Sequence, residues 1–118
     1  MHAATKKVIF AFRGDSMCFI HVLLNGIDLR ERGLGGEIVM EGEAITLLPE
    51  IRQQGHPLYS LYQKAREMGI FAGACKACSA KLKMTEVVEQ EGLEKLGDMT
   101  GHPAMAGYIE NGYDIITF

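Results

Sequence analysis

The sequence lacks several features that mark other classes of protein. No apolar run approaches the roughly 20 residues that a membrane-spanning helix requires. The net charge is −3, so there is no excess of positive charge that would favour binding to nucleic acid. No internal repeat, linker or low-complexity tract divides the chain. We therefore expect a single domain over residues 1–118, with no membrane and no nucleic acid among its partners.

Cysteine is also scarce. The chain has three cysteines, and an odd number argues against a disulfide framework of the kind found in small secreted domains. The N-terminal segment 1–7 has no apolar core of the kind that a signal peptide needs. These two absences predict reduced thiols and a cytoplasmic protein. Hydrophobic residues make up 47% of the chain and charged residues 23%, the balance of a domain that buries one core.

Sequence motifs for nucleotides and metals are missing too. Gly14, Gly42 and Gly73 lie in separate units, and neither a G-x-G-x-x-G nor a Walker pattern is present. We therefore expect no nucleotide, flavin or other cofactor. A single C-x-x-C is a weak basis for zinc, which usually takes four ligands, although Cys18 and His102 could in principle complete a set. We expect no metal.

Short apolar runs alternate with helical patterns along the whole chain. This alternation over short connections predicts an α/β fold, a three-layer α/β/α sandwich with a mostly parallel sheet of about five strands. The segment from 85 to 96 is the least regular, with a helix suggested around Val87 and Val88 and a short strand within 93–99. The clearer strands are predicted over 7–12, 37–40, 70–74 and 113–118.

The first helix is predicted from its caps and its apolar spacing. Asp15 or Ser16 can cap its start, and Gly33 is suited to the left-handed position just after its end. Its buried face is expected to consist of apolar residues at helical spacing, namely Ile20, Leu23, Leu24 and Ile27.

The pair Cys75 and Cys78 is the most chemically specific feature of the sequence. Cys75 follows the apolar run 70–74 and precedes the helix-forming residues 79–83, so it lies where a strand ends and a helix begins. Unpaired N–H groups and the helix dipole at such a junction favour a thiolate. Open α/β sheets also bind ligands at the carboxyl ends of their strands. We interpret the pair as reactive; the alternative is two small buried hydrophobes.

Five further residues are expected to assist at this edge of the sheet. Lys76 adjoins the thiols and adds positive potential, unless it is simply solvated. Cys18 follows the first strand and is either a resolving thiol or an ordinary helix cysteine. Arg13 and Glu41 lie in loops that flank the edge, where Arg13 can steer an anionic sulfur donor. His102 precedes a proline and either faces this edge or has a local turn role.

The order of elements resembles that of the DsrE/DsrF-like proteins of the sulfur-relay group. The resemblance covers nearly the full length and is carried by three stretches: 7–12 with its turn and helix, 70–82, and 101–109 followed by 113–118. It implies a carrier that accepts a sulfane sulfur from a donor protein or small compound, holds it as Cys–S–SH and passes it to an acceptor. It also implies a homo-oligomer, a trimer or a hexamer.

The resemblance places the acceptor role on Cys75. Cys78 departs from the family pattern, in which many relatives have one cysteine here, and it permits sulfide release through a Cys75–Cys78 disulfide. Two other functions stay open. The pair could cycle as a thiol–disulfide oxidoreductase, with a defined two-electron potential. Alternatively, the cysteines could be inert and the protein a non-catalytic subunit of an oligomer.

Overall fold

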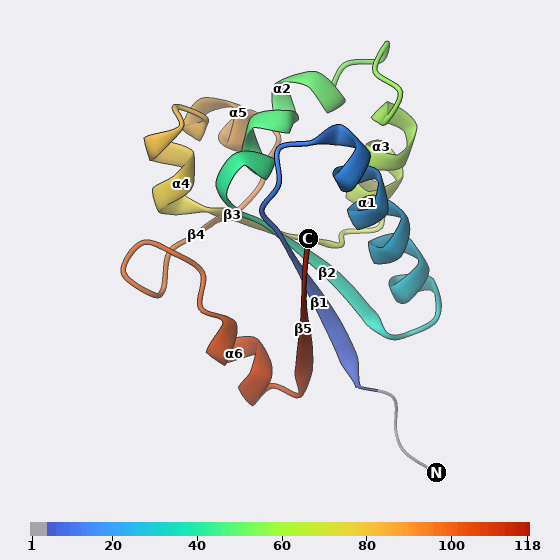
Figure 1. Ribbon diagram of the computed structural model, residues 1–118, viewed down its shortest axis with the longest axis vertical. Helices are drawn as coiled ribbons and strands as arrows, with labels where there is room; N and C mark the ends of the chain where they lie inside the picture. The colour runs from blue at the N-terminus through green and yellow to red at the C-terminus, as the bar shows by residue number, and fades with distance from the viewer. Residues whose placement is uncertain (1–4) are drawn as a thin grey trace.

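The computed structural model describes residues 5–118 and shows an α/β fold built on a five-stranded parallel sheet (Figure 1). His2 and the rest of the segment 1–4 lie outside the described residues. None of the helices within 5–118 combines the length and apolar character needed to cross a membrane. The elements in chain order are β1 (Lys6–Ala11), α1 (Ser16–Glu31), β2 (Gly35–Met40), the 3₁₀-helix η1 (Gly42–Leu47), α2 (Leu48–Ile51), α3 (Tyr59–Glu67), β3 (Phe71–Cys75), α4 (Lys76–Lys81), α5 (Thr85–Gln90), β4 (Lys95–Leu96), α6 (Met105–Glu110) and β5 (Tyr113–Thr117).

The sheet has the strand order β4-β3-β2-β1-β5, and every neighbouring pair is parallel. All five carboxyl ends therefore lie at one edge of the sheet, as the alternation of strands and helices predicts. In β1, Ile9 and Ala11 face one core cluster while Val8 and Phe10 face a second, and all four side chains are buried. Burial on both faces explains why the central strands are continuous apolar runs.

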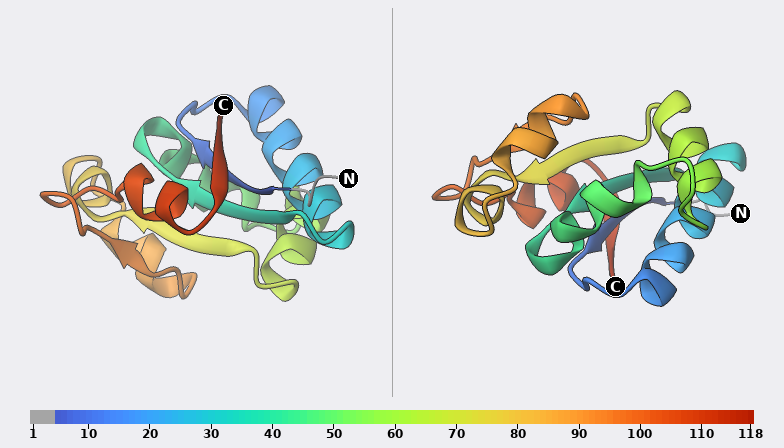
Figure 2. Two further views of the ribbon diagram at one scale, coloured as in Figure 1. Left: turned by 90° about the horizontal axis from the view of Figure 1, so that it is seen from below. Right: turned by 90° about the horizontal axis from the view of Figure 1, so that it is seen from above.

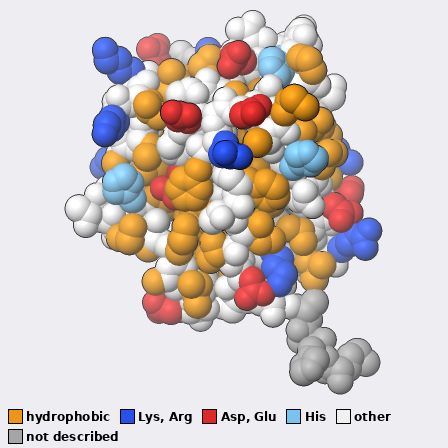
Figure 3. All heavy atoms as spheres, viewed as in Figure 1, with side chains coloured by type: hydrophobic (Ala, Val, Ile, Leu, Met, Phe, Trp, Pro, Cys, Tyr) orange, Lys and Arg blue, Asp and Glu red, His pale blue; other side chains and the backbone are white. Residues whose placement is uncertain are grey.

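The two helical layers differ in thickness. Helices α1 to α5, together with η1, contribute to the larger core cluster on one face. Among the helices within residues 5–118, only α6 contributes to the smaller cluster, where Tyr108 packs edge-on against Phe10 with ring centroids 5.8 Å apart. In Figure 1, α6 lies alone at the lower left, away from the other helices. Figure 3 shows apolar side chains gathered over this thinly covered region of the surface.

Helix α1 confirms the predicted caps but turns a different face to the core. The Asp15 side chain accepts a hydrogen bond from the backbone N–H of Met17, and Gly33 has a φ of +76° just after the helix. Leu24, expected to be buried, is 45% exposed. Phe19 and Val22 are buried beside Leu23 and Ile27 instead, since the larger aromatic side chain is drawn into the core.

The expected short strand within 93–99 is confirmed as β4, and a glycine makes its pairing possible. The backbone N–H of Ala74 donates to the carbonyl oxygen of Glu94 at 2.8 Å. This carbonyl lies over Gly73, whose φ is +152°, and a Cβ added there would sit 2.3 Å from the Glu94 oxygen. Only glycine permits so close an approach of two backbones at this point.

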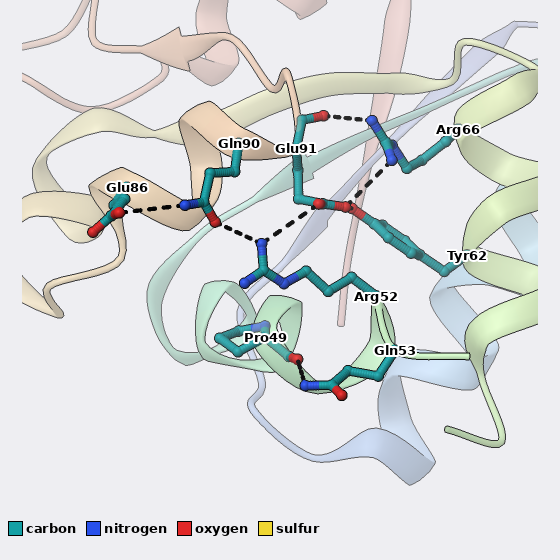
Figure 4. A network of polar contacts seen from close by, with 8 residues as sticks. All are labelled: Pro49, Arg52, Gln53, Tyr62, Arg66, Glu86, Gln90 and Glu91. Atoms are coloured by element: carbon teal, nitrogen blue, oxygen red, sulfur yellow. Dashed lines mark hydrogen bonds and ion pairs between the residues drawn. The ribbon is translucent and has the colours of Figure 1, made fainter. Parts of the chain in front are cut away.

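A polar network anchors the end of α5 to α2 and α3 (Figure 4). The Tyr62 hydroxyl donates to Oε1 of Glu91 at 2.6 Å, and the Arg66 guanidinium contacts the same oxygen at 3.3 Å and the Glu91 carbonyl at 2.7 Å. Arg52 lies 3.7 Å from the other carboxylate oxygen. The Glu91 side chain is 11% exposed, so these contacts hold a nearly buried charge. They fix the segment that leads into β4.

Candidate functional site

Cys75 occupies the junction that the sequence predicts, as both the last residue of β3 and the N-cap of α4. Its sulfur accepts a hydrogen bond from the backbone N–H of Cys78 at 3.3 Å, the contact that a serine or aspartate usually makes at a helix start. The Ser79 hydroxyl donates to the Cys75 carbonyl at 2.7 Å and is itself buried. Hydrogen bonds from the first turn of α4 thus fix both the side chain and the carbonyl group of Cys75.

A tight hairpin between β4 and α6 covers this junction. Met99 and His102 exchange two backbone hydrogen bonds, of 2.8 and 3.0 Å, around the central residues Thr100 and Gly101. Both central residues have positive φ, +51° and +88°, as a two-residue type I′ turn requires. The Gly101 carbonyl then accepts from the backbone N–H of Ala77 at 2.8 Å, which docks the hairpin on the first turn of α4.

This hairpin places His102 against the thiol. His102 Nδ1 lies 3.2 Å from Cys75 Sγ, and the Gly101 carbonyl oxygen lies 3.8 Å from the same sulfur. Cys75 has no exposed surface, whereas Cys78 and His102 are half-buried. In Figure 2 the β3 arrow leads into α4 beside the loop that precedes α6. His102 therefore does face this edge of the sheet, in addition to its place in a turn.

Glu41 completes the cluster from the neighbouring strand. It follows β2 directly, and its backbone N–H donates to the Ala11 carbonyl at 2.8 Å, so the residue continues the strand pairing by one position. Its side chain is 7% exposed and forms no salt bridge within residues 5–118. One ligand atom from each of Glu41, Cys75, Cys78 and His102 lies within 4.8 Å of all the others.

The surroundings of Cys75 favour the thiol over the thiolate, contrary to the sequence-based expectation. Burial, with smaller contributions from the Cys78 thiol and the Glu41 carboxylate, raises the pKa of Cys75 to about 12. The hydrogen bond from the Cys78 N–H lowers the pKa, as predicted for a helix start, but desolvation is the larger effect. Burial also raises the pKa of Glu41, against smaller lowering contributions from Cys75 and His102.

The remaining predicted site residues lie elsewhere. Cys18 does not belong to the four-residue cluster. Its sulfur lies 3.9 Å from Nη1 of Arg13, and the Arg13 side chain is exposed. Lys76 is also exposed, with its aliphatic stem lying over Gly97. Of the residues named beside the cysteines, the fold therefore brings only Glu41 and His102 into the cluster.

A groove elsewhere on the molecule is separate from the cluster. It has a volume of about 660 Å³ and lies between β4 and α6, where Leu96, Tyr108 and Tyr113 contribute to its walls. None of the four cluster residues lines it. The cysteine pair therefore lies outside this groove.

Comparison with known proteins finds one solved structure with a similar fold. No family model matches the sequence. A chain of Bacteroides thetaiotaomicron described as a conserved protein of unknown function, BT1422, has a TM-score of 0.68 at 15% identity, and the alignment covers 99% of this chain and 100% of that one. This likeness shows the same α/β architecture.

Two archaeal sequences are similar to this chain. An uncharacterized protein of Archaeoglobus fulgidus is 41% identical over 46 residues, which are 39% of this chain and 74% of the relative. The uncharacterized protein MJ0733 of Methanocaldococcus jannaschii is 30% identical over 97 residues, which are 82% of this chain and 77% of the relative. The chain belongs to the same protein family as MJ0733.

Proposed function

We propose that the protein carries sulfane sulfur on the Cys75–Cys78 pair. The observation that carries this proposal is the placement of two reduced cysteines at the carboxyl end of β3, with an imidazole nitrogen 3.2 Å from one sulfur. The resemblance of the sequence to sulfur-relay proteins supports the same chemistry. A thiol beside a proton acceptor is the arrangement that nucleophilic sulfur chemistry needs.

The two thiols differ in solvent exposure, and we assign them different roles on this basis. Cys75 is fully buried and Cys78 is half-buried, so an incoming donor meets Cys78 first. We therefore propose Cys78 as the acceptor, in place of Cys75, to which the family resemblance assigns this role. In the transfer step, the Cys78 sulfur attacks the terminal sulfur of a donor persulfide, R–S–SH. The new bond joins Cys78 to that sulfur, the donor S–S bond breaks, and its electron pair leaves on the donor thiolate. No oxidant or reductant is consumed, because one S–S bond replaces another.

His102 and Cys75 support this step from within the cluster. A ring nitrogen of His102 lies within 4.8 Å of the Cys78 sulfur and 3.2 Å from the Cys75 sulfur. The proton lost by the Cys78 thiol passes to this imidazole, which then supplies a proton to the departing donor thiolate. The Cys75 sulfur accepts a hydrogen bond from the backbone N–H of Cys78. This hydrogen bond fixes the first turn of α4 and therefore the position of Cys78. On this proposal the partners are donor and acceptor proteins or small sulfane-sulfur compounds, in a cytoplasmic trimer or hexamer.

Intact-mass spectrometry tests the proposal. Reduced, chelator-treated protein is incubated with a sulfane-sulfur donor and compared with Cys75→Ser, Cys78→Ser and the control Cys18→Ser. We expect a gain of one sulfur atom in the parent and in Cys18→Ser, and none in Cys78→Ser. No gain in the folded parent, or a gain in Cys78→Ser equal to that of the parent, would refute sulfur transfer at this pair.

A second function is favoured by one observation, the closeness of the two sulfurs in the cluster. A dithiol at a helix start can cycle between reduced and oxidised forms with a thioredoxin-type partner. This alternative predicts the loss of two hydrogens under mild oxidant in the parent and in Cys18→Ser. It also predicts no mass gain from the sulfur donor.

A further inference from the structure

The four side chains at the carboxyl edge of the sheet form a complete ligand set for a transition-metal ion. Two thiols, one imidazole and one carboxyl group come from the ends of β2 and β3, the first turn of α4 and the hairpin before α6. These are the three ligand types that zinc uses in proteins. All four residues are candidates from the sequence, but only the fold shows that Glu41 and His102 lie next to the cysteines.

The separations suit a small tetrahedral ion. Metal–ligand bonds of about 2.0–2.3 Å place the ligand atoms of a tetrahedral zinc site about 3.3–3.8 Å apart. His102 Nδ1 and Cys75 Sγ are already 3.2 Å apart, and the widest separation in the cluster is within 4.8 Å. Closing the set around an ion therefore needs side-chain shifts of about 1 Å, on the scale of rotamer adjustments.

The charge balance of the cluster points to a cation. Glu41 is 7% exposed, and no lysine or arginine lies within salt-bridge distance of it in the described part of the chain. Buried carboxylates are normally paired with a cation or bound to a metal. The two basic residues expected at this edge do not supply that charge, since Lys76 extends over Gly97 and Arg13 contacts Cys18.

The backbone around the cluster is already organised to hold the ligands. Cys75 and Glu41 lie at strand ends joined to their neighbours by backbone hydrogen bonds. His102 is fixed by the Met99 pairing and by the Ala77–Gly101 bond that docks the hairpin on α4. A ligand set built on rigid elements loses little conformational freedom when the metal enters, which favours binding.

We propose that Cys75, Cys78, His102 and Glu41 form a binding site for Zn²⁺. Two thiolates and an imidazole select a zinc-class ion over Mg²⁺ or Ca²⁺, which prefer all-oxygen sites. With four protein ligands the site has the closed form of a structural zinc centre. Bound zinc joins β2, β3 and the hairpin, and it occupies both thiols, so the sulfur transfer proposed above takes place in the metal-free form.

Zinc titration of the reduced, metal-free full-length protein tests the site. Competition with a chromophoric chelator gives the stoichiometry and the affinity. We expect one Zn²⁺ per chain, and an affinity at least about tenfold lower in Glu41→Gln, His102→Ala and Cys78→Ser. Two matched controls, Glu43→Gln on an exposed carboxylate two residues away and Cys18→Ser outside the cluster, should bind like the parent.

Co²⁺ supplies a second readout that does not depend on the folding of any variant. Bound by the parent, it should give the intense d–d absorption of a tetrahedral ion together with thiolate-to-cobalt charge transfer. No stoichiometric zinc binding, an octahedral cobalt spectrum, or unchanged affinity in folded Glu41→Gln and His102→Ala would overturn the proposal. These measurements need no sulfur donor, so their outcome is separate from that of the persulfide test.

Discussion

Replacing Glu91 by alanine should destabilise the protein more than any other single change to an ion pair. The Tyr62 side chain has no exposed surface, and its hydroxyl donates to the Glu91 carboxylate at 2.6 Å. Leaving a buried hydroxyl without a partner costs about 1–3 kcal/mol. Arg52 and Arg66 are one-third exposed, and each lost ion pair adds at most about 1 kcal/mol. The sum is about 3 kcal/mol.

Urea denaturation followed by circular dichroism measures this loss. A decrease of about 3 kcal/mol in the free energy of unfolding corresponds to a fall in Tm of about 10 °C for a domain of this size. Glu86→Ala is the control, because Glu86 lies on α5 (Figure 4), the helix that Glu91 directly follows, and its side chain is exposed. Its change should stay within about 0.5 kcal/mol. Equal effects of the two substitutions would refute a stabilising role for the network.

Three other predictions test the fold. Burial and its carboxylate partner raise the pKa of Tyr62, so its contribution to stability is present below about pH 10 and is lost at higher pH, by up to about 1.4 kcal/mol per pH unit. Above pH ~10, the free energy of unfolding from urea titrations should fall less steeply with pH in Tyr62→Phe than in the parent, and equal slopes would contradict this prediction. Gly73→Ala should cost about 2 kcal/mol or more, because its Cβ would meet the Glu94 carbonyl, whereas Gly55→Ala meets no atom within 4 Å and should not lower the urea midpoint. Asp15→Ala removes a helix cap and should lower the free energy of unfolding by about 1 kcal/mol, measured in the same way; no change would show that the cap is dispensable.

The sequence predicts the sheet well because the relevant signals are local. Strands buried on both faces require continuous apolar runs, and these runs are visible in the sequence at β1, β2 and β3. The position of Cys75 follows from the same local signals, since a strand run stops and a helical pattern begins there. The caps of α1 are equally local, and the structure confirms Asp15 and Gly33.

Predictions that depend on packing are less accurate. The spacing of apolar residues in α1 allows two neighbouring faces, and only contact with the sheet selects the one that leaves Leu24 exposed. The pKa of Cys75 was expected to fall because the helix start is visible in sequence. Burial and the approach of Glu41 are not visible there, and they reverse the direction.

The tertiary structure alone decides which side chains meet. Chain order and residue type predict that Glu41 and Cys75 lie at strand ends on one edge of the sheet, because parallel strands share their direction, and they leave the position of His102 open. They do not determine the distances, which depend on β2 and β3 being neighbours and on the hairpin that turns His102 back onto α4. The same is true of Glu91, which meets Tyr62 and Arg66 across 25 or more residues of chain. Local periodicity thus determines the elements, whereas long-range packing creates the thiol cluster.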